Sequence, residues 1–443
     1  MSSLYLHNAT LVTGDTERPL IAKGSILVRD GLIAVVASGE SDHPQVDRSI
    51  DCGGALVVPG WINAHHHLYS TLARGYAVPG PSPKGFMDIL ERLWWKLDRA
   101  LTAEDVYVST ILGLMDAVRA GCTTVIDHHA SPGCVDGSLD VMAQAFRDIG
   151  LSGCLCYETS DRNREGEGIE ENIRFLEACR KSDDDQITGL FGLHASMTLG
   201  EKTLARAAEA GQALGAGFHV HIAEGEADGE VTRERYGKEL FSRFVEAGIA
   251  GPTSLFAHGI HLTARELDQM KETGSMLVTN PESNQNNGLG HTPLLEALER
   301  GILCGLGTDG MCCAMPAQAR AAYLIQRAAR RDSSVAFMEA ATLLTRNNPA
   351  IARRWFKTPR GKLAPGYQAD LAIHTYRPIT PLTGDTLAGH LLFGLPYAPV
   401  KMTIARGRVV MEDGMISHVD EEQLLAKSRE CAGALWKRVD AMS

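Results

Sequence analysis

Features that mark several protein classes are missing from this sequence. None of the ten cysteines belongs to a Cys-x-x-Cys pair, which argues against a zinc ribbon. The net charge is −11 and no segment is rich in Lys and Arg, so we expect no nucleic-acid partner. No apolar run reaches the roughly 18 residues that a membrane span requires, so we expect no membrane-embedded segment.

The start of the chain also lacks a targeting signal. The segment MSSLYLHNATLVTGD has no basic stretch followed by an apolar stretch, so we expect no secretion signal. In a long chain without such a signal, scattered cysteines are typical of reduced thiols. We therefore expect a cytoplasmic protein.

The length and composition favour a large domain with a smaller one beside it. The chain has 443 residues, of which 44% are hydrophobic and 22% charged, whereas a (β/α)8 barrel alone takes about 250 residues. Residues 1–58 and 361–443 both contain short strand patterns separated by Gly and Asp turns. We expect these two end segments to form one small β-sandwich, with a terminal helix over about residues 420–441.

The central region, residues 59–360, alternates short apolar strands with amphipathic helices. Such alternation is typical of a parallel sheet covered by helices. We expect eight strands, at residues 57–65, 121–129, 151–159, 187–194, 217–224, 254–260, 275–280 and 301–309. Eight βα units predict an α/β fold of the (β/α)8, TIM-like barrel type. A doubly wound sheet is the alternative, but no Gly-x-Gly-x-x-Gly motif follows an early strand.

Histidines occur where several of these strands end, which is the face that carries the active site in a barrel. The first strand ends in three consecutive histidines, at positions 65 to 67. Because side chains alternate along a strand, His65 and His67 share one face and His66 points the other way. Two imidazoles on one face can chelate one metal ion. Taken alone, the pattern is equally consistent with a histidine cluster that binds nothing.

The fifth strand adds a histidine and a carboxylate. His221 lies at its end and Glu224 follows three residues later, a spacing that suits a metal ligand beside a proton shuttle. His219 shares the face of His221, and we interpret it as a hydrogen-bonded barrel histidine.

Asp309 ends the last strand, which lies beside the first strand once a barrel closes. His65, His67 and His221 together with Asp309 would then hold one divalent metal with a position left for water. On its own, the glycine after Asp309 would favour a turn role for the aspartate.

Five segments together resemble the amidohydrolase superfamily: PGWINAHHHLYSTLARG, HVHIAEGEAD, LFAHGIHLT, TNPESNQNNG and GLGTDG. Within it the chain resembles the cytosine-deaminase-like branch that includes the triazine hydrolases. The segments LWWKLDRALT, GCTTVIDHHASP, YETSDRN and EGIEENIRF are most similar to SsnA-type aminohydrolases. The likeness spans nearly the whole chain and implies the same barrel, split sandwich and metal site.

The resemblance also implies roles for single residues. It assigns the same four metal ligands and makes Glu224 the acid/base. It implies that His258, at the end of the sixth strand, polarises water or binds the departing group, and that His194 touches the substrate. Members with two metals carry a carboxylated lysine on the fourth strand, and residues 187–194 contain no lysine, so we expect one metal. Zinc is the first expectation and iron the alternative. The resemblance further implies a homodimer.

One departure from the branch concerns the seventh strand. Related deaminases carry His-Asn-Pro there, whereas this chain has Thr279 before Asn280 and Pro281. The substrate contacts near Ser283 and Asn284 therefore stay open.

Further candidates for substrate contact come from loops that follow strands. Trp94 and Trp95 end a Gly- and Pro-rich loop that could cover the barrel mouth, and either indole could stack on a flat ring. Helix packing is the alternative for at least one of them. His128 and His129 end the second strand, and we expect one to face the site and the other the helices. Glu158 and Arg162 follow the third strand as polar candidates, with a solvated loop as the alternative.

These observations predict a metal-dependent hydrolase that acts on a non-peptide C–N bond of a small substrate. We expect hydrolytic deamination of a planar nitrogen heterocycle of the purine, pterin or pyrimidine type, with Glu224, His258 and Asp309 handling protons. One alternative is the removal of chloride or an alkylamine from a triazine-like ring. Another is a metal-binding scaffold without turnover.

Overall fold

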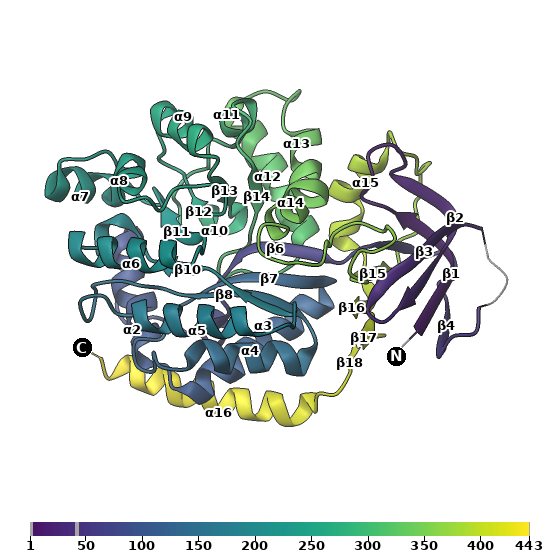
Figure 1. Ribbon diagram of the computed structural model, residues 1–443, viewed down its shortest axis with the longest axis horizontal. Helices are drawn as coiled ribbons and strands as arrows, with labels where there is room; N and C mark the ends of the chain where they lie inside the picture. The colour runs from purple at the N-terminus through teal and green to yellow at the C-terminus, as the bar shows by residue number, and fades with distance from the viewer. Residues whose placement is uncertain (1–2, 40–43, 443) are drawn as a thin grey trace.

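The computed structural model describes residues 3–39 and 44–442. Figure 1 shows a main body of parallel strands surrounded by helices, with a second sheet at one side of it. The termini lie at opposite sides of the molecule (Figure 1).

Two parallel sheets form the centre of the main body. One has the order β6-β7-β8-β9 and the other the order β10-β11-β12-β13-β14. Their bounds are β6 (Trp61–His66), β7 (Cys122–His129), β8 (Ser152–Tyr157), β9 (Ile187–Gly189), β10 (Phe191–Leu193), β11 (Phe218–Ile222), β12 (Leu255–His258), β13 (Met276–Thr279) and β14 (Cys304–Leu306). Strands thus occur in all eight expected segments, and the fourth segment is divided into β9 and β10 at Leu190.

Isolated bridges join the two sheets at both edges. Thr159, after β8, pairs in parallel with Leu193 of β10, and His66 of β6 pairs in parallel with Asp309, after β14. Backbone hydrogen bonds accompany each bridge, from His194 N to Thr159 O at 2.9 Å and from Thr308 N to His65 O at 2.9 Å. The carboxyl ends of the strands in both sheets therefore meet around one space.

Helices connect the strands and cover the outside of the sheets (Figure 1). They are η1 (Leu68–Ala73), α1 (Phe86–Ile89), η2 (Leu90–Trp94), α2 (Trp95–Ala100), α3 (Ala103–Arg119), α4 (Ser138–Ile149), α5 (Ile169–Lys181), η3 (Ser196–Thr198), α6 (Glu201–Ala213), α7 (Glu226–Tyr236), α8 (Leu240–Glu246), α9 (Ala264–Thr273), α10 (Pro281–Asn286), α11 (Leu294–Glu299), α12 (Met315–Arg330), α13 (Phe337–Thr342), η4 (Leu343–Asn347) and α14 (Asn348–Ala352). Local sequence sets several of their ends. Capping boxes start α3 at Thr102 and α9 at Thr263, and left-handed glycines end α4 and α9.

Alternation along the strands divides their side chains between two cores. On β8, Leu155 and Tyr157 belong to the hydrophobic cluster beneath the helices. Cys154 and Cys156 belong to a separate cluster between the strands. Because side chains alternate along a strand, the even positions of β8 face the interior and the odd positions face the helices.

Strands from both ends of the chain share one nine-stranded sheet. Its order is β18-β17-β16-β15-β5-β1-β2-β3, with β4 paired to β1. The bounds are β1 (Ser3–Val12), β2 (Leu20–Arg29), β3 (Leu32–Ser38), β4 (Arg48–Asp51), β5 (Leu56–Pro59), β15 (Leu371–His374), β16 (Val400–Ala405), β17 (Arg408–Glu412) and β18 (Met415–Ile416). The two ends meet where β5 pairs antiparallel with β15, and the sheet has its own hydrophobic cluster. The short helices α15 (Leu387–Phe393) and η5 (Leu395–Tyr397) lie between β15 and β16.

The terminal helix α16 (Glu421–Asp440) occupies the segment that the sequence predicts as helical. It runs along the main body below α2, α3 and α4 (Figure 1). The Trp436 indole donates to Leu72 O at 2.9 Å, and the Arg438 guanidinium donates to Ala100 O at 2.8 Å. These bonds attach α16 to η1 and α2, the segments that follow β6.

No helix within residues 3–39 and 44–442 is long and apolar enough to cross a membrane.

Gly217 provides a test of strand packing next to β11. A Cβ atom at this position would lie 1.9 Å from Thr253 O, a backbone atom that cannot move independently. We expect Gly217→Ala to lower the free energy of unfolding by about 2–3 kcal/mol, the usual cost of overpacking a core. Gly251→Ala is the matched control, because nothing lies within 4 Å of its added Cβ. Urea denaturation of both variants checks this, and equal midpoints would contradict the expectation.

Candidate active site

The candidate site lies at the carboxyl ends of the parallel strands, as expected for a barrel-type sheet. His65 comes from β6, and His221 lies one residue before the end of β11. Asp309 follows β14 and His258 closes β12. Asp309 and His258 adopt left-handed backbone conformations with φ of 54° and 76°, and so does Ala223 with φ of 48°. Three such non-glycine residues around one space indicate backbone strain of the kind that active sites hold.

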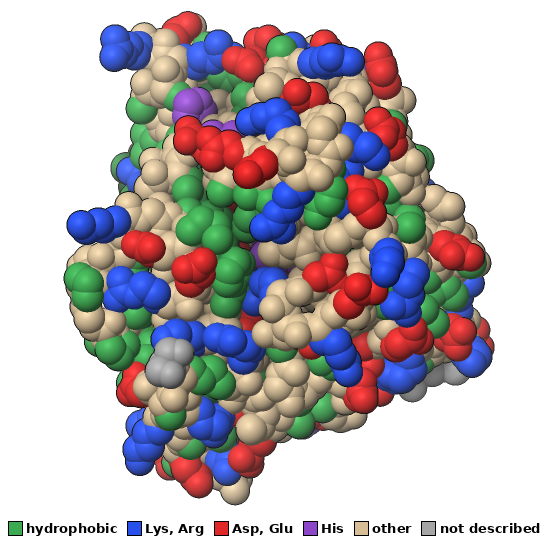
Figure 2. All heavy atoms as spheres, turned by 90° about the vertical axis from the view of Figure 1, so that its left-hand side faces the viewer, with side chains coloured by type: hydrophobic (Ala, Val, Ile, Leu, Met, Phe, Trp, Pro, Cys, Tyr) green, Lys and Arg blue, Asp and Glu red, His purple; other side chains and the backbone are tan. Residues whose placement is uncertain are grey.

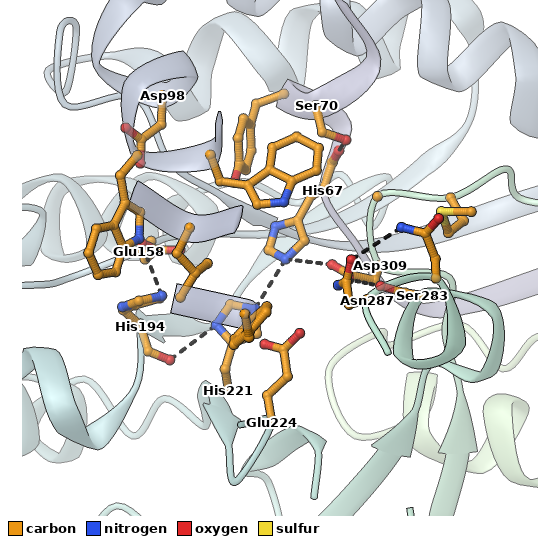
Figure 3. A pocket seen from close by; sticks show the side chains of 18 residues that line it. His67, Ser70, Asp98, Glu158, His194, His221, Glu224, Ser283, Asn287 and Asp309 are labelled. Atoms are coloured by element: carbon orange, nitrogen blue, oxygen red, sulfur yellow. Dashed lines mark hydrogen bonds and ion pairs between the residues drawn. The ribbon is translucent and has the colours of Figure 1, made fainter. Parts of the chain in front are cut away.

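Backbone carbonyls orient two of the imidazoles. His67 Nδ1 donates to His128 O at 2.5 Å, and His221 Nδ1 donates to His194 O at 3.1 Å. A carbonyl oxygen only accepts, so the Nδ1 atom of each ring carries the hydrogen. The two Nε2 atoms then face each other at 3.1 Å (Figure 3). Two neutral rings would oppose their lone pairs there, so the arrangement requires a positive charge between them.

His65 and Asp309 complete the group. His65 Nε2 is buried and has no hydrogen-bond partner in the described part of the chain. It lies 3.8 Å from Asp309 Oδ1, and His67 Nε2 lies 3.1 Å from the same oxygen. Ligands about 2.0–2.2 Å from a tetrahedral metal are roughly 3.4 Å apart. The orphaned nitrogen and these spacings fit a divalent metal.

The charges of the group agree with this fit. Burial opposes protonation of His67, but its hydrogen bond and charge interaction with Asp309 raise its pKa to about 9. Burial also acts on Asp309, yet His67 and the Ser283 hydroxyl, which donates to Oδ2, hold the pKa of this carboxyl well below its usual range. Burial lowers the pKa of His65 and His221 well below the ordinary value. A metal would thus replace one proton in an otherwise unprotonated ligand set.

Glu224 and His258 lie beside the metal group, our name for His65, His67, His221 and Asp309. Glu224 Oε2 lies 3.6 Å from His258 Nε2, and its carboxylate points to the space between His221 and Asp309 (Figure 3). Burial, followed by the negative charge of Asp309, raises the pKa of Glu224 well above its ordinary value. His258 Nδ1 donates to Asn284 Oδ1 at 2.9 Å, which fixes its ring. Glu224 is therefore suited to hold and deliver a proton.

A pocket opens above this group. Its apolar wall consists of Tyr69, Phe86, Leu90, Trp94, Trp95 and Met311, and its polar wall includes Ser70, Asp98, Glu158, His194, Ser283, Asn286 and Asn287. Between its lining atoms the pocket encloses about 760 Å³, including the solvent at its mouth. Figure 2 shows the side of the molecule that lies at the left of Figure 1, where hydrophobic side chains gather near the middle and charged side chains surround them. Two indoles beside a polar wall suit a flat heterocycle.

A buried ion-pair cluster forms the polar end of the pocket. Arg162 Nη2 lies 2.7 Å from both Asp98 Oδ2 and Glu158 Oε1, and its guanidinium lies 5.2 Å from the Trp95 ring centroid. Burial raises the pKa of Asp98 to about 6. Burial also acts on Glu158, but His194 and Arg162 lower its pKa to about 2. Glu158 is thus a charged acceptor at the pocket wall.

The expected substrate contacts divide into two groups. Trp94, Glu158 and His194 line the pocket, whereas Arg162 is not among the lining residues and instead holds Glu158. His128 lies beneath the site, where its Nε2 faces Leu193 O at 3.1 Å and His219 O at 3.2 Å.

Neither His128 nor His129 lines the pocket, and His129 lies on the opposite face of β7 from His128. Its Nε2 lies 2.8 Å from Ser131 Oγ, and its ring packs against Tyr69 and Tyr157. Strand alternation explains the difference, because His128 is an inward position of β7 and His129 an outward one.

Sequence reasoning missed several lining residues. Tyr69 and Ser70 lie two and three residues after His67, on η1. Their closeness to the three histidines in the sequence could have marked them as pocket residues. Asp98 lies one helical turn after Trp94 and Trp95, a spacing that places it on their side of α2. Ser283, whose role the sequence leaves open, donates a hydrogen bond to Asp309. Met311 follows Asp309 in a loop, and no pattern in the sequence points to it.

The chain matches the amidohydrolase family over residues 56–410. Because this match covers most of its length, the chain belongs to that family and is an enzyme of the hydrolase class. The resemblance predicted from the sequence is thereby confirmed.

Relatives of known name are deaminases. A 5'-deoxyadenosine deaminase of Methanosarcina mazei is 29% identical over 452 residues, covering 100% of both chains. A 5-methylthioadenosine/S-adenosylhomocysteine deaminase of Syntrophomonas wolfei is 29% identical over 438 residues, covering 98% of this chain and 99% of the relative.

Solved structures share the fold. An adenosine deaminase from Xanthomonas campestris with bound zinc superposes with a TM-score of 0.86 at 22% identity, covering 98% of this chain and 99% of the other. An atrazine chlorohydrolase from Arthrobacter aurescens complexed with zinc superposes with a TM-score of 0.83 at 19% identity, covering 97% and 100%. Together with the family, these neighbours imply a TIM-barrel fold.

Asp127 is a buried carboxyl directly beneath the metal group. Its Oδ2 accepts a hydrogen bond from Leu68 N at 2.7 Å, which fixes the backbone immediately after His67. Its Oδ1 has no partner among the described residues. Burial raises the pKa of Asp127 to about 7.

We expect Asp127→Asn to stabilise the metal-free protein at alkaline pH. When the pKa of a carboxyl rises from 3.8 to about 7 on folding, its contribution to the free energy of unfolding is fully present below about pH 4. That contribution is lost as the pH rises through 7, and asparagine removes this loss. The variant should match the parent at pH 4 and exceed its unfolding free energy by up to about 4 kcal/mol at pH 8. Urea denaturation with a chelator present measures this, and a pH-independent difference would contradict it.

Proposed function

We propose that this protein is a metal-dependent aminohydrolase that removes the exocyclic amino group of a planar nitrogen heterocycle, foremost a 6-aminopurine. The observation that carries the proposal is the convergence of His65, His67 and His221 with Asp309, beside Glu224, whose pKa burial raises. Relatives that align with the whole chain carry the names of adenosine-type deaminases.

The proposed centre holds one divalent ion, zinc first and iron as the alternative. Its ligands would be the Nε2 atoms of His65, His67 and His221 and a carboxylate oxygen of Asp309. The segment of β9 and β10 contains no lysine that could bridge a second ion, which supports a single one. Zinc is present in two solved structures that share the fold.

The proposed chemistry divides the proton transfers between two sides of the reacting carbon. A bound divalent ion supplies Lewis acidity, which lowers the pKa of an adjacent water molecule. Asp309 and His258 Nε2 take the proton of the attacking water and orient it. Glu224 gives its proton to the ring nitrogen next to the attacked carbon, then takes up one proton of the former water and delivers it to the leaving ammonia. The second proton of the water, taken by Asp309 and His258, restores the acid form of Glu224. The net reaction consumes one water and exchanges the amino group for an oxygen.

The pocket supports recognition of a flat ring with polar edges. We assign Trp94 and Trp95 to stacking and Glu158 and His194 to polar contact with the substrate. Arg162 positions Glu158 through the ion pair at 2.7 Å, and His128 supports the ligands from below.

We also infer that the two parallel sheets form one closed eight-stranded barrel over residues 59–360, with β9 and β10 as one strand. The bridges at both edges support closure. Residues 1–58 and 361–443 then form the sandwich around their own hydrophobic cluster, with α16 returning to the barrel. The homodimer and the cytoplasmic location stay predictions.

Replacement of a proposed ligand tests the metal centre. We expect the purified protein to retain about one divalent ion per chain and His221→Ala to retain almost none, because three ligands hold the ion far less tightly. His261→Ala serves as control, since this histidine is exposed and follows β12 outside the ligand set. Elemental analysis after dialysis gives the count, and a full complement in His221→Ala would overturn the ligand assignment.

Ammonia release tests the reaction. Zinc- and iron-loaded protein is assayed on 5'-deoxyadenosine, 5'-methylthioadenosine, S-adenosylhomocysteine, guanine, pterin, cytosine and chlorotriazines. We expect ammonia from an aminopurine, and Glu224→Gln should lower kcat at least a hundredfold because it removes the proton donor. The exposed Glu226 provides the matched control Glu226→Gln. Chloride or alkylamine release instead of ammonia would favour the triazine alternative, and silence with metal bound would favour a scaffold.

A further inference from the structure

His65 differs from the other two histidine ligands in what holds its ring. Its Nδ1 lies 2.8 Å from His219 Nε2, a side-chain nitrogen, whereas His67 and His221 face backbone carbonyls. His219 Nδ1 in turn lies 3.7 Å from Cys156 Sγ, and Cys156 Sγ lies 3.5 Å from Asp127 O. The side chains of this chain of contacts are completely buried.

The last acceptor fixes the direction of every hydrogen bond in this series. A carbonyl oxygen has no hydrogen to give, so the Cys156 thiol donates to Asp127 O. The sulfur then accepts from His219 Nδ1, which leaves a lone pair on His219 Nε2. His65 Nδ1 must therefore donate to that lone pair. The remaining nitrogen of His65, Nε2, is left with a lone pair that faces the metal group.

We propose that Cys156 and His219 are positioning residues that hold His65 in the tautomer able to bind metal, a proposal that rests on the metal centre described above. A direct carbonyl partner would enforce this tautomer without help. His219 does not, because a neutral imidazole can present either a donor or an acceptor at Nε2. If His219 donated from Nε2, His65 would carry its hydrogen at Nε2 and lose its lone pair. The thiol of Cys156 removes that option.

The proposal gives a function to two residues that the catalytic scheme does not use. Partners of ligating histidines typically change metal affinity 10- to 100-fold when they are removed. Cys154 provides a matched control on the same strand, because it lies two residues earlier on the same inward face in the same cluster. The charges that act on its thiol are those of Cys179 and Arg360 rather than that of a histidine.

The test compares zinc dissociation constants of metal-free protein by competition with a chromogenic chelator. Cys156→Ala should weaken zinc binding at least tenfold. Cys156→Ser keeps both a donor and an acceptor and should stay within about threefold of the parent, as should Cys154→Ala. The visible absorption of cobalt-loaded protein should shift in Cys156→Ala alone, since it reports the ligand field. A second pair, His219→Gln and His219→Leu, covers poor folding of the cysteine variants, because glutamine can accept from His65 and donate to Cys156 whereas leucine can do neither.

Each outcome decides the matter. Equal zinc affinity in Cys156→Ala and Cys154→Ala would overturn the proposal, and so would equal losses in the serine and alanine variants, since size rather than hydrogen bonding would then be responsible. Equal affinities of His219→Gln and His219→Leu would overturn it as well. If the parent protein itself binds no zinc, the metal centre fails, which is a different result from a parent that binds zinc with variants that all bind alike.

Discussion

A histidine that ligates a metal keeps only one hydrogen on its ring, and the rest of the site depends on where that hydrogen goes. His67 and His221 give it to the carbonyls of His128 and His194. Those carbonyls belong to the ends of neighbouring strands, so the sheet itself points the Nε2 atoms inward. The fold thereby creates a concentration of lone pairs and one carboxylate that only a cation can neutralise.

The negative charge of Asp309 also acts on Glu224, the proposed proton donor on the other side of the site. His67 and Ser283 lower the pKa of Asp309, whereas burial, together with the charge of Asp309, raises the pKa of the neighbouring Glu224. The pKa values of two carboxyls a few ångströms apart are therefore shifted in opposite directions. The difference arises from their surroundings and not from the residue type. Asp309 accepts hydrogen bonds from His67 and Ser283, whereas Glu224 is removed from solvent beside a negative charge.

Much of the candidate metal group could be predicted because its convergence rests on rules that act locally. Strand alternation placed His65 and His67 together, and the chain order of the strands brought His221 and Asp309 to the same end. The substrate wall could not be predicted in the same way. β7 is buried on both faces because helices cover one side and the interior fills the other, so its sequence shows no alternation of polar and apolar residues that would distinguish His128 from His129. Met311 lines the pocket from the loop after Asp309, and its place there depends on long-range packing that no short pattern records.

The end sheet joins residues that are far apart in the chain, since β5 at Leu56–Pro59 pairs with β15 at Leu371–His374. During synthesis, the edge of β5 that pairs with β15 has no partner until about four fifths of the chain has been made, whereas its other edge can pair with β1 early. Contacts of such long sequence separation close slowly and leave unpaired strand edges exposed to other chains. The barrel strands, which pair with near neighbours in sequence, can assemble first. This topology makes completion of the end sheet a late folding event that requires the whole polypeptide.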